Sequence, residues 1–282
     1  MSAPDLIESI RVVAVVVTWN RRALVEECLA ALAAQTHRPA VVVIVDNDSD
    51  DGTAEFLDAQ ASDWLQVVHL SSNTGGAGGF AAGTQLALGH SPDLIWLLDD
   101  DTIPTQTAAG ELVTAWASYA PDVADRPAVL ASRVVWTDGR DHPMNTPRAK
   151  PGARPAELQA AGAVGAIPVR SASFVSIMCA ADVVRERGLP IADYFLWNDD
   201  FEYSTRLIRG GVGLYCPRSV VVHKTRAFGS TDADPGERFF FEVRNKIWLF
   251  GRATSLGPTE KALYGGSTLR RWARTVAGSS DR

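Results

Sequence analysis

Three consecutive carboxylates, Asp99, Asp100 and Asp101, directly follow the apolar run Leu94–Leu98 in this 282-residue chain. A short apolar run without polar alternation predicts a strand that is buried on both faces of a parallel sheet. The carboxylates then lie at the carboxyl end of this strand, where open α/β sheets bind their ligands. Adjacent like charges repel, so they need a partner. A divalent cation that also binds phosphate oxygens suits them better than a solvated acidic turn.

A second pair of acids, Asp199 and Asp200, begins a stretch with helical spacing of apolar residues that ends at Gly210. Asp199 or Asp200 can cap this predicted helix. Because a helix N-terminus favours the ionised form, we expect a carboxylate there to be charged at neutral pH and only weakly basic. Residues 213–222 then form an extended segment that ends at His223.

Strands and helices are predicted to alternate four times in the first part of the chain. Alternation with short connections predicts a parallel sheet with helices on both faces. Pro104 is expected to begin the helix that follows the acidic triplet. Polar residues gather where the predicted strands end, so one rim of the sheet is predicted to bind a nucleotide. The predicted strands are 11–18, 40–45, 65–70 and 94–98, and the predicted helices are 23–34, 53–60 and a segment that follows the glycine-rich loop 71–80 and ends near residue 88.

The second half has a mixed pattern. Strands are predicted at 127–136 and 173–180, a short helix at 182–187, and an amphipathic helix at 238–250. Residues 137–158 are rich in proline, glycine and charge, so we predict a mobile loop there.

Composition bounds the class of protein. Hydrophobic residues make up 46% and charged residues 21%, as in a soluble globular protein. The net charge of −6 argues against non-specific nucleic-acid binding, although residues 238–282 carry nine basic and three acidic residues, which suggests contact with an anionic membrane face. The three separated cysteines favour reduced buried thiols and a cytoplasmic location. We find no signal-peptide layout and no membrane-spanning run.

Five short motifs occur in order: VVVTWNR (15–21), VDNDS (45–49), NTGGAGGF (73–80), DDD (99–101) and WNDDFEY (197–203). Together they resemble the inverting family 2 glycosyltransferases (GT2) of the GT-A fold, an α/β fold with a Rossmann-like, mostly parallel sheet. The nearest resemblance is to bacterial galactofuranosyl- and rhamnosyltransferases of cell-wall and surface-polysaccharide synthesis. Each motif is weak alone, and the likeness covers about residues 12–250.

The resemblance implies a donor site and a metal site. It makes Asp99 and Asp101 ligands of Mn²⁺ or Mg²⁺, with His223 as a further ligand, and places Asp100 near the ribose. Because the glycines do not directly follow their strand, we interpret the loop as a close approach to the donor and not as a dinucleotide fingerprint. The implied donor-binding residues are Thr18, Asn20, Arg21, Asp46, Asn73, Gly75, Gly76 and Asp100.

The resemblance also implies an acceptor side. Family position assigns the base to the Asp199–Asp200 pair, and we prefer Asp200. Trp197, Glu202 and Arg244 are further acceptor-side predictions. The implied division is a nucleotide-sugar-binding half (1–137), a mobile loop (138–162), an acceptor-binding half of the same domain (163–237) and a basic C-terminal helical segment (238–282).

The predicted function is metal-dependent transfer of a sugar from a nucleotide donor to a hydroxyl of a surface glycan. The resemblance implies an acceptor linked to a lipid diphosphate, at the inner face of the plasma membrane. UDP-galactofuranose is the first choice of donor and dTDP-rhamnose the alternative. Competing classes are a phosphatase with an Asp-x-Asp nucleophile loop, a nucleotidyltransferase and a non-catalytic nucleotide-sugar-binding protein. The phosphatase would need its loop on the first strand, and the nucleotidyltransferase would need glycines and basic residues after it.

Overall fold

The computed structural model describes residues 3–120, 122–228 and 236–278. Its first half alternates strands and helices as the sequence predicts. After the short helix α1 (Ala3–Ser9), the elements are β1 (Val12–Thr18), α2 (Arg22–Ala33), β2 (Val41–Asp46), α3 (Thr53–Gln60), β3 (Leu65–His69), α4 (Gly75–Gly89) and β4 (Leu94–Asp99).

The second half completes the sheet and adds two long helices. Three short 3₁₀ turns, at Val123–Asp125, Ala192–Tyr194 and Gly236–Arg238, connect its elements. These elements are β5 (Thr102–Pro104), α5 (Ala108–Tyr119), β6 (Val129–Val135), α6 (Pro155–Ala163), β7 (Ile167–Val169), β8 (Ser176–Ala180), α7 (Ala181–Arg187), α8 (Asp199–Ile208), β9 (Gly213–His223), α9 (Phe239–Gly251) and α10 (Pro258–Gly278).

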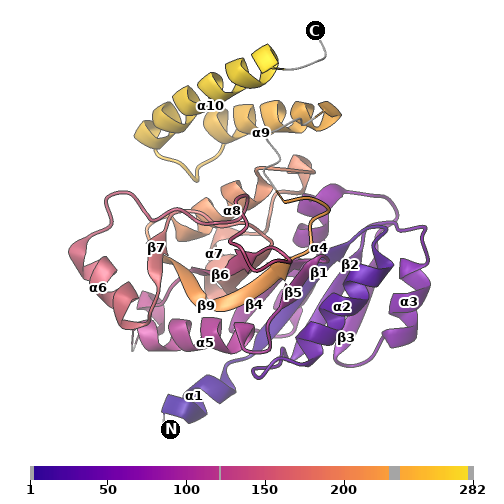
Figure 1. Ribbon diagram of the computed structural model, residues 1–282. Helices are drawn as coiled ribbons and strands as arrows, with labels where there is room; N and C mark the ends of the chain where they lie inside the picture. Colours follow the sequence, from indigo (N-terminus) through magenta and orange to yellow (C-terminus); the bar gives the residue numbers. More distant parts are fainter. Residues whose placement is uncertain (1–2, 121, 229–235, 279–282) are drawn as a thin grey trace.

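One sheet runs through the molecule in the order β3-β2-β1-β4-β8-β6-β9-β5, with β7 paired to β9 (Figure 1). The strands β3, β2, β1 and β4 are parallel, whereas β8 is antiparallel to both of its neighbours. The register sets Thr18 opposite Asp46, and Val17 opposite Asp99. Parallel strands therefore end together, and their polar residues meet at one rim as expected.

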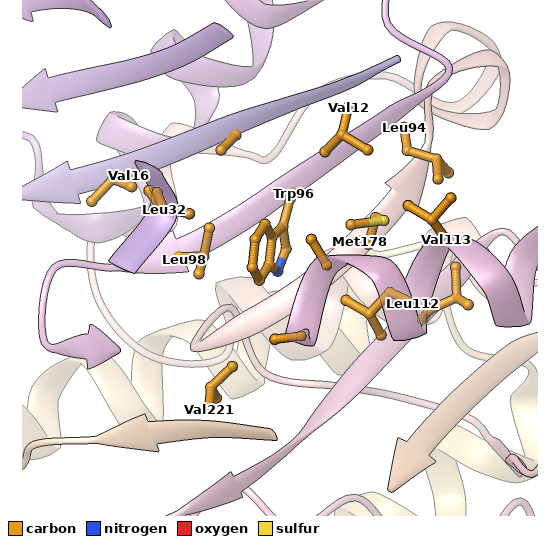
Figure 2. Close-up of a cluster of buried hydrophobic side chains, with 14 of the residues drawn as sticks. Val12, Val16, Leu32, Leu94, Trp96, Leu98, Leu112, Val113, Met178 and Val221 are labelled. Atoms are coloured by element: carbon orange, nitrogen blue, oxygen red, sulfur yellow. The ribbon is translucent and has the colours of Figure 1, made fainter. Parts of the chain in front are cut away.

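The core lies on both faces of the central strands. Every residue of β1 and β2 is buried, which explains their unbroken runs of valine and isoleucine. Trp96 of β4 lies within the cluster in Figure 2, where its ring is surrounded by side chains of β1, β8 and α5. Its indole nitrogen donates to Ser176 Oγ at 3.0 Å. The core thus holds β4 rigidly, and β4 ends in the acidic triplet.

Three predicted elements differ from the structure. Pro104 does not begin a helix: it ends β5 at the sheet edge, where a residue without an N–H is tolerated, and α5 begins at Ala108. The loop predicted at 137–158, and drawn to 162 as a separate unit, carries α6 over its last part, with proline at the first helical turn. The glycine-rich segment is helical from Gly75 onward.

The helices α9 and α10 lie next to each other as a layer over α8, on the side of α8 away from the sheet (Figure 1). Helix α9 matches the predicted amphipathic segment, but its apolar residues do not all face the core. Phe240 and Ile247 are 62% and 59% exposed, and Leu263 and Leu269 of α10 are 75% and 64% exposed. None of the helices in the described ranges is long and apolar enough to cross a membrane.

Candidate active site

Asp99, Asp101 and His223 each turn one potential ligand atom toward a common space, and these atoms lie within 4.8 Å of one another. Asp99 ends β4, and the antiparallel pairing of β5 with β9 sets Thr102 opposite His223. That pairing brings the imidazole to Asp101, with Nε2 3.1 Å from Oδ1. Two carboxylates and one imidazole are a donor set that fits a divalent cation.

Burial and neighbouring charges shift the pKa values of all three side chains. Burial and the charge of Asp101 raise the pKa of Asp99 to about 7. Burial would also raise the pKa of Asp101, but bonds from His223 and Arg21 outweigh it and the pKa is lowered. Burial lowers the pKa of His223, yet Asp101 more than compensates and the pKa is raised. A bound cation would offset the repulsion that these shifts record.

The middle carboxylate, Asp100, is almost fully buried and makes different contacts. Thr18 Oγ1 donates to its Oδ2 at 2.9 Å, and Arg21 Nη1 lies 3.0 Å from its Oδ1. The same Arg21 nitrogen is 2.7 Å from Asp101. Burial raises the pKa of Asp100 to about 6 against the opposing charge of Arg21. Asp100 and Thr18 therefore hold the loop and Arg21, and their predicted contact with the donor stays a prediction.

A hydrogen-bonded chain connects the metal cluster to the acidic end of α8. Asn145 accepts from His223, with Oδ1 3.0 Å from Nδ1, and donates through Nδ2 to Ser173 Oγ at 3.1 Å. Ser173 in turn lies near enough to the Asp200 carboxylate to oppose the rise in its pKa. The predicted base and the predicted metal ligands thus lie on one side of the molecule, joined by two residues that the sequence analysis did not single out.

Asp199 and Asp200 occupy the first turn of α8 and remain partly accessible. Burial raises the pKa of Asp199 well above its ordinary value, and the charges of Asp200 and Asp99 raise it further. Burial also raises the pKa of Asp200, against hydrogen bonds from the Phe201 N–H and Ser173. The expectation of a weak base at a helix N-terminus is therefore wrong in direction: burial outweighs the helix dipole, so either carboxylate is a stronger base than an exposed aspartate.

The turn before α8 is strained and is held by α9. Phe195, Trp197 and Asn198 all have positive φ, between 62° and 65°. The fully buried Asn245 donates through Nδ2 to the backbone carbonyls of Tyr194, Leu196 and Trp197 at 2.7–2.9 Å. This amide positions the first turn of α8, and the sequence analysis missed it because it is one polar residue within an amphipathic helix.

Two predicted acceptor residues are occupied by internal contacts. Arg244 donates to the carbonyls of Asp193 and Tyr194 at 2.8 Å and lies over Trp248, so it supports the turn. Glu202 is 1% exposed and pairs with Arg206 at 2.9 Å. Both side chains therefore stabilise the region around α8, and their contact with an acceptor stays a prediction. Trp197 stays partly exposed.

The remaining donor-side predictions lie around the ends of β1, β2 and β3. Asp46 is buried and bonds to His69 Nδ1 at 2.9 Å. Asn20 bonds to Asp50 at 2.8 Å and so ties the first loop to the second. Asn73 accepts from Asn47 Nδ2 at 3.1 Å. All three are on the predicted rim, and all are engaged by neighbours.

The glycine run has a packing reason. Gly75 begins α4 with φ of 70°, and a Cβ there would lie 2.1 Å from the carbonyl oxygen of Phe195. A Cβ at Gly79 would lie 2.4 Å from Val17. Both glycines thus allow close contact with protein, and the predicted role of Gly75 toward the donor stays a prediction. Gly76 has no other atom within 4 Å of a built Cβ and does face free space.

Comparison with known proteins agrees with this geometry. Residues 13–176, more than half of the chain, match the family described as Glycosyl transferase family 2. The chain belongs to glycosyltransferase family 2. This family 2 glycosyltransferase is 32% identical to galactofuranosyltransferase GlfT1 of Mycolicibacterium smegmatis over 215 residues, which are 71% of this chain and 66% of that protein. It is 29% identical to GlfT1 of Mycobacterium tuberculosis over 86% of this chain and 82% of that one.

Solved structures confirm the GT-A fold expected for a family 2 glycosyltransferase. S. aureus TarS residues 1–349 with UDP-GlcNAc superimposes with a TM-score of 0.62 at 15% identity, over 93% of this chain and 72% of that one. GalNAc-T7 with UDP, GalNAc and Mn²⁺ gives 0.62 at 15% identity, over 92% and 54%. The mannosyltransferase PcManGT of Pyrobaculum calidifontis with GDP-Man and Mn²⁺ gives 0.56 at 18% identity, over 97% and 77%. Family membership also excludes the phosphatase and nucleotidyltransferase alternatives.

Proposed function

We propose that this protein is a metal-dependent inverting galactofuranosyltransferase that uses UDP-galactofuranose and extends a cell-wall or surface glycan. The observation that carries the proposal is that hydrogen bonds lead from His223 through Asn145 to Ser173, which lies beside Asp200, so a metal-type donor set and a separate carboxylate are close together. The likeness to GlfT1 supports the choice of sugar.

Asp99, Asp101 and His223 would hold Mn²⁺ or Mg²⁺, and the set fits because its ligand atoms already converge within 4.8 Å. Such a cation supplies a Lewis acid that neutralises a departing diphosphate. Arg21 is half exposed beside Asp100 and Asp101, so its guanidinium adds positive charge at the same place. The role of Thr18 and Asp100 is to keep that guanidinium oriented.

In the proposed reaction Asp200 removes the proton of an acceptor hydroxyl as its oxygen bonds to the anomeric carbon. The bond from that carbon to the diphosphate oxygen breaks, and the nucleoside diphosphate leaves. A single displacement by one base inverts the anomeric configuration. The raised pKa of Asp200 suits this step, because a stronger base accepts the proton more readily.

We further propose that the acceptor is presented at a membrane surface. Exposed Leu263 and Leu269, with exposed Arg270 and Arg274 on the same helix, support contact with an anionic lipid face. Three further residues of the segment 238–282 have internal contacts: Trp248 packs on Tyr194, and Arg271 and Trp272 bond to Glu242.

A panel of nucleotide sugars tests the donor. The protein is incubated with UDP-galactofuranose, dTDP-rhamnose, UDP-GlcNAc or GDP-mannose, with Mn²⁺, Mg²⁺ or a chelator, and the release of nucleoside diphosphate and the anomeric configuration of the product are recorded. We expect metal-dependent turnover of UDP-galactofuranose with inversion. Turnover of dTDP-rhamnose alone would show that the donor sugar is rhamnose and not galactofuranose. Tight donor binding without turnover under every condition would show that the protein binds nucleotide sugars without catalysis.

A further inference from the structure

A hollow of about 520 Å³ lies between the ends of α7 and α8 and the loop that joins α9 to α10. Five of its eight lining residues are basic, although the chain as a whole carries a net charge of −6. It is remote from the carboxylate end of α8. That helix has ten residues, so about 15 Å separates its two ends. The basic residues are Arg187, Arg206, Arg209, Arg252 and Lys261.

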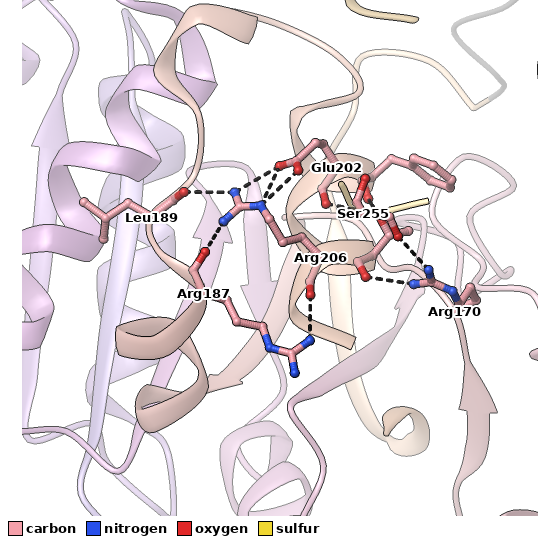
Figure 3. A network of polar contacts seen from close by, with 8 residues as sticks. Arg170, Arg187, Leu189, Glu202, Arg206 and Ser255 are labelled. Carbon is pink, nitrogen blue, oxygen red and sulfur yellow. Dashed lines mark hydrogen bonds and ion pairs between the residues drawn. The ribbon is translucent and has the colours of Figure 1, made fainter. Parts of the chain in front are cut away.

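Two of these cations, Arg187 and Arg206, are held in place by hydrogen bonds. Arg206 donates to the carbonyls of Arg187 and Leu189 and pairs with the buried Glu202, and Arg187 returns a bond to the carbonyl of Arg206 (Figure 3). These contacts fasten the end of α7 to α8, and they satisfy carbonyls that a helix end leaves free. Packing alone explains this pair of arginines.

The other three cations have no such explanation. Arg209, Arg252 and Lys261 make no side-chain hydrogen bond or ion pair with any residue that the structure describes. The charge of Glu260 interacts with that of Arg209, but the Glu260 carboxylate is already bonded to Arg170 and to the Gly257 N–H. Three cations around one hollow repel one another, and an anion that contacts all of them would remove that cost.

We propose that this hollow binds a phosphate or diphosphate group, and that it is a second anion site distinct from the one that takes the donor diphosphate. Arginine forks and a lysine ammonium are the groups that proteins use for phosphate oxygens. A phosphate carried by a lipid and a free phosphate compound share this chemistry. The site goes beyond the proposed transfer reaction and does not depend on it.

Calorimetric titration of the full chain with inorganic pyrophosphate tests the site. A chelator is present, so that metal-dependent binding at the acidic cluster does not contribute. The test variant is Arg209→Gln with Arg252→Gln. The matched control is Arg185→Gln with Arg218→Gln, which removes the same charge from exposed residues that do not line the hollow. We expect the test variant to bind at least about tenfold more weakly and the control to change by less than about twofold.

Single variants at Lys261 distinguish a loss of pyrophosphate binding from a loss of folding. Lys261→Gln should weaken pyrophosphate binding, Lys261→Arg should retain it, and both should keep the wild-type melting temperature. No pyrophosphate binding by the wild type, or an equal loss in test and control variants, would overturn the proposal.

Vesicle sedimentation then distinguishes the two sources of phosphate. The vesicles contain phosphatidylcholine with either phosphatidic acid or phosphatidylserine at equal charge. A preference for phosphatidic acid that disappears in the test variant supports a lipid phosphate as the ligand. Pyrophosphate binding without that preference supports a free phosphate compound at the same site.

Discussion

His223 and Asn145 are joined by a hydrogen bond of 3.0 Å between Nδ1 and Oδ1, and both side chains are buried. An amide oxygen can only accept, so this bond places an imidazole proton on Nδ1 and turns Nε2 toward Asp101, where its lone pair would serve an ion once the Nε2 proton is lost. The relationship crosses 78 residues of chain and determines which nitrogen of His223 is available.

Replacing Asn145 by leucine should therefore weaken Mn²⁺ binding. Outer contacts to a metal-ligating histidine are worth about 10–100-fold in metal affinity, and we expect a loss in that range. Asn145→Asp keeps an acceptor for His223 and should lose less. Titration of Mn²⁺ followed by calorimetry measures both variants, and wild-type affinity in Asn145→Leu would show that the histidine is not a ligand.

The response to Mn²⁺ should depend on pH. The pKa of Asp99 is raised to about 7 and that of Asp100 to about 6, so the folded protein binds protons that the unfolded chain releases, and the stability of the metal-free protein falls as pH rises through this range. The raised pKa of His223 acts in the same direction. Mn²⁺ replaces these protons, and its effect on the melting temperature should be larger by roughly 3 °C or more at about pH 8 than at about pH 5.5. Equal shifts at both pH values would contradict a metal site at Asp99.

Gly75 and Gly76 make a matched pair of sites. At Gly75 the positive φ and the approach of the Phe195 carbonyl exclude a side chain, so Gly75→Ala should destabilise the protein by about 3 kcal/mol or more. At Gly76 a Cβ meets no other atom, and Gly76→Ala should be neutral or stabilising by up to about 1 kcal/mol in stability. Urea unfolding compares the two variants, and similar free energies of unfolding would refute the packing role assigned to Gly75.

Asn245 should be as important to activity as to stability. Asn245→Asp points a carboxylate at three backbone carbonyls in a fully buried place, which we expect to cost about 3 kcal/mol or more and to lower transfer by releasing the first turn of α8. Ile247→Asp introduces the same residue on the exposed side of α9, and its stability should stay within about 0.5 kcal/mol of wild type. Unfolding curves and initial rates measured side by side give both quantities. Near-wild-type stability and rate in Asn245→Asp would show that the Asn245 amide does not position the first turn of α8.

Much of the fold could be predicted because the signals are local. Unbroken β-branched runs gave β1 and β2, and the acidic triplet after an apolar run placed the rim of the sheet. Pro104 and the segment containing α6 were misjudged because proline suits a helix start, an edge strand and a loop equally well, and only the position in the sheet decides among them.

The site was predictable where a motif carries the chemistry and unpredictable where a long-range contact does. Asp99, Asp101 and His223 do converge as expected. Asn145, Ser173 and Asn245 belong to no motif, and their importance comes from partners 28 to 78 residues away. Glu202 and Arg244 were predicted on the acceptor side, and the structure shows Glu202 paired with Arg206 of the same helix and Arg244 bonded to the turn before α8.

The most direct test of the account compares Asp200→Asn with Asp199→Asn and the wild type, using UDP-galactofuranose and Mn²⁺. Donor affinity is measured by calorimetry, and transfer to acceptor is measured in a single turnover. A base that faces the acceptor is worth roughly 10²–10⁴ in rate and contributes little to donor binding. We predict that Asp200→Asn keeps the donor affinity of the wild type and loses transfer by that factor. Near-normal transfer by Asp200→Asn, with the loss appearing in Asp199→Asn instead, would contradict the assignment of Asp200 as the base.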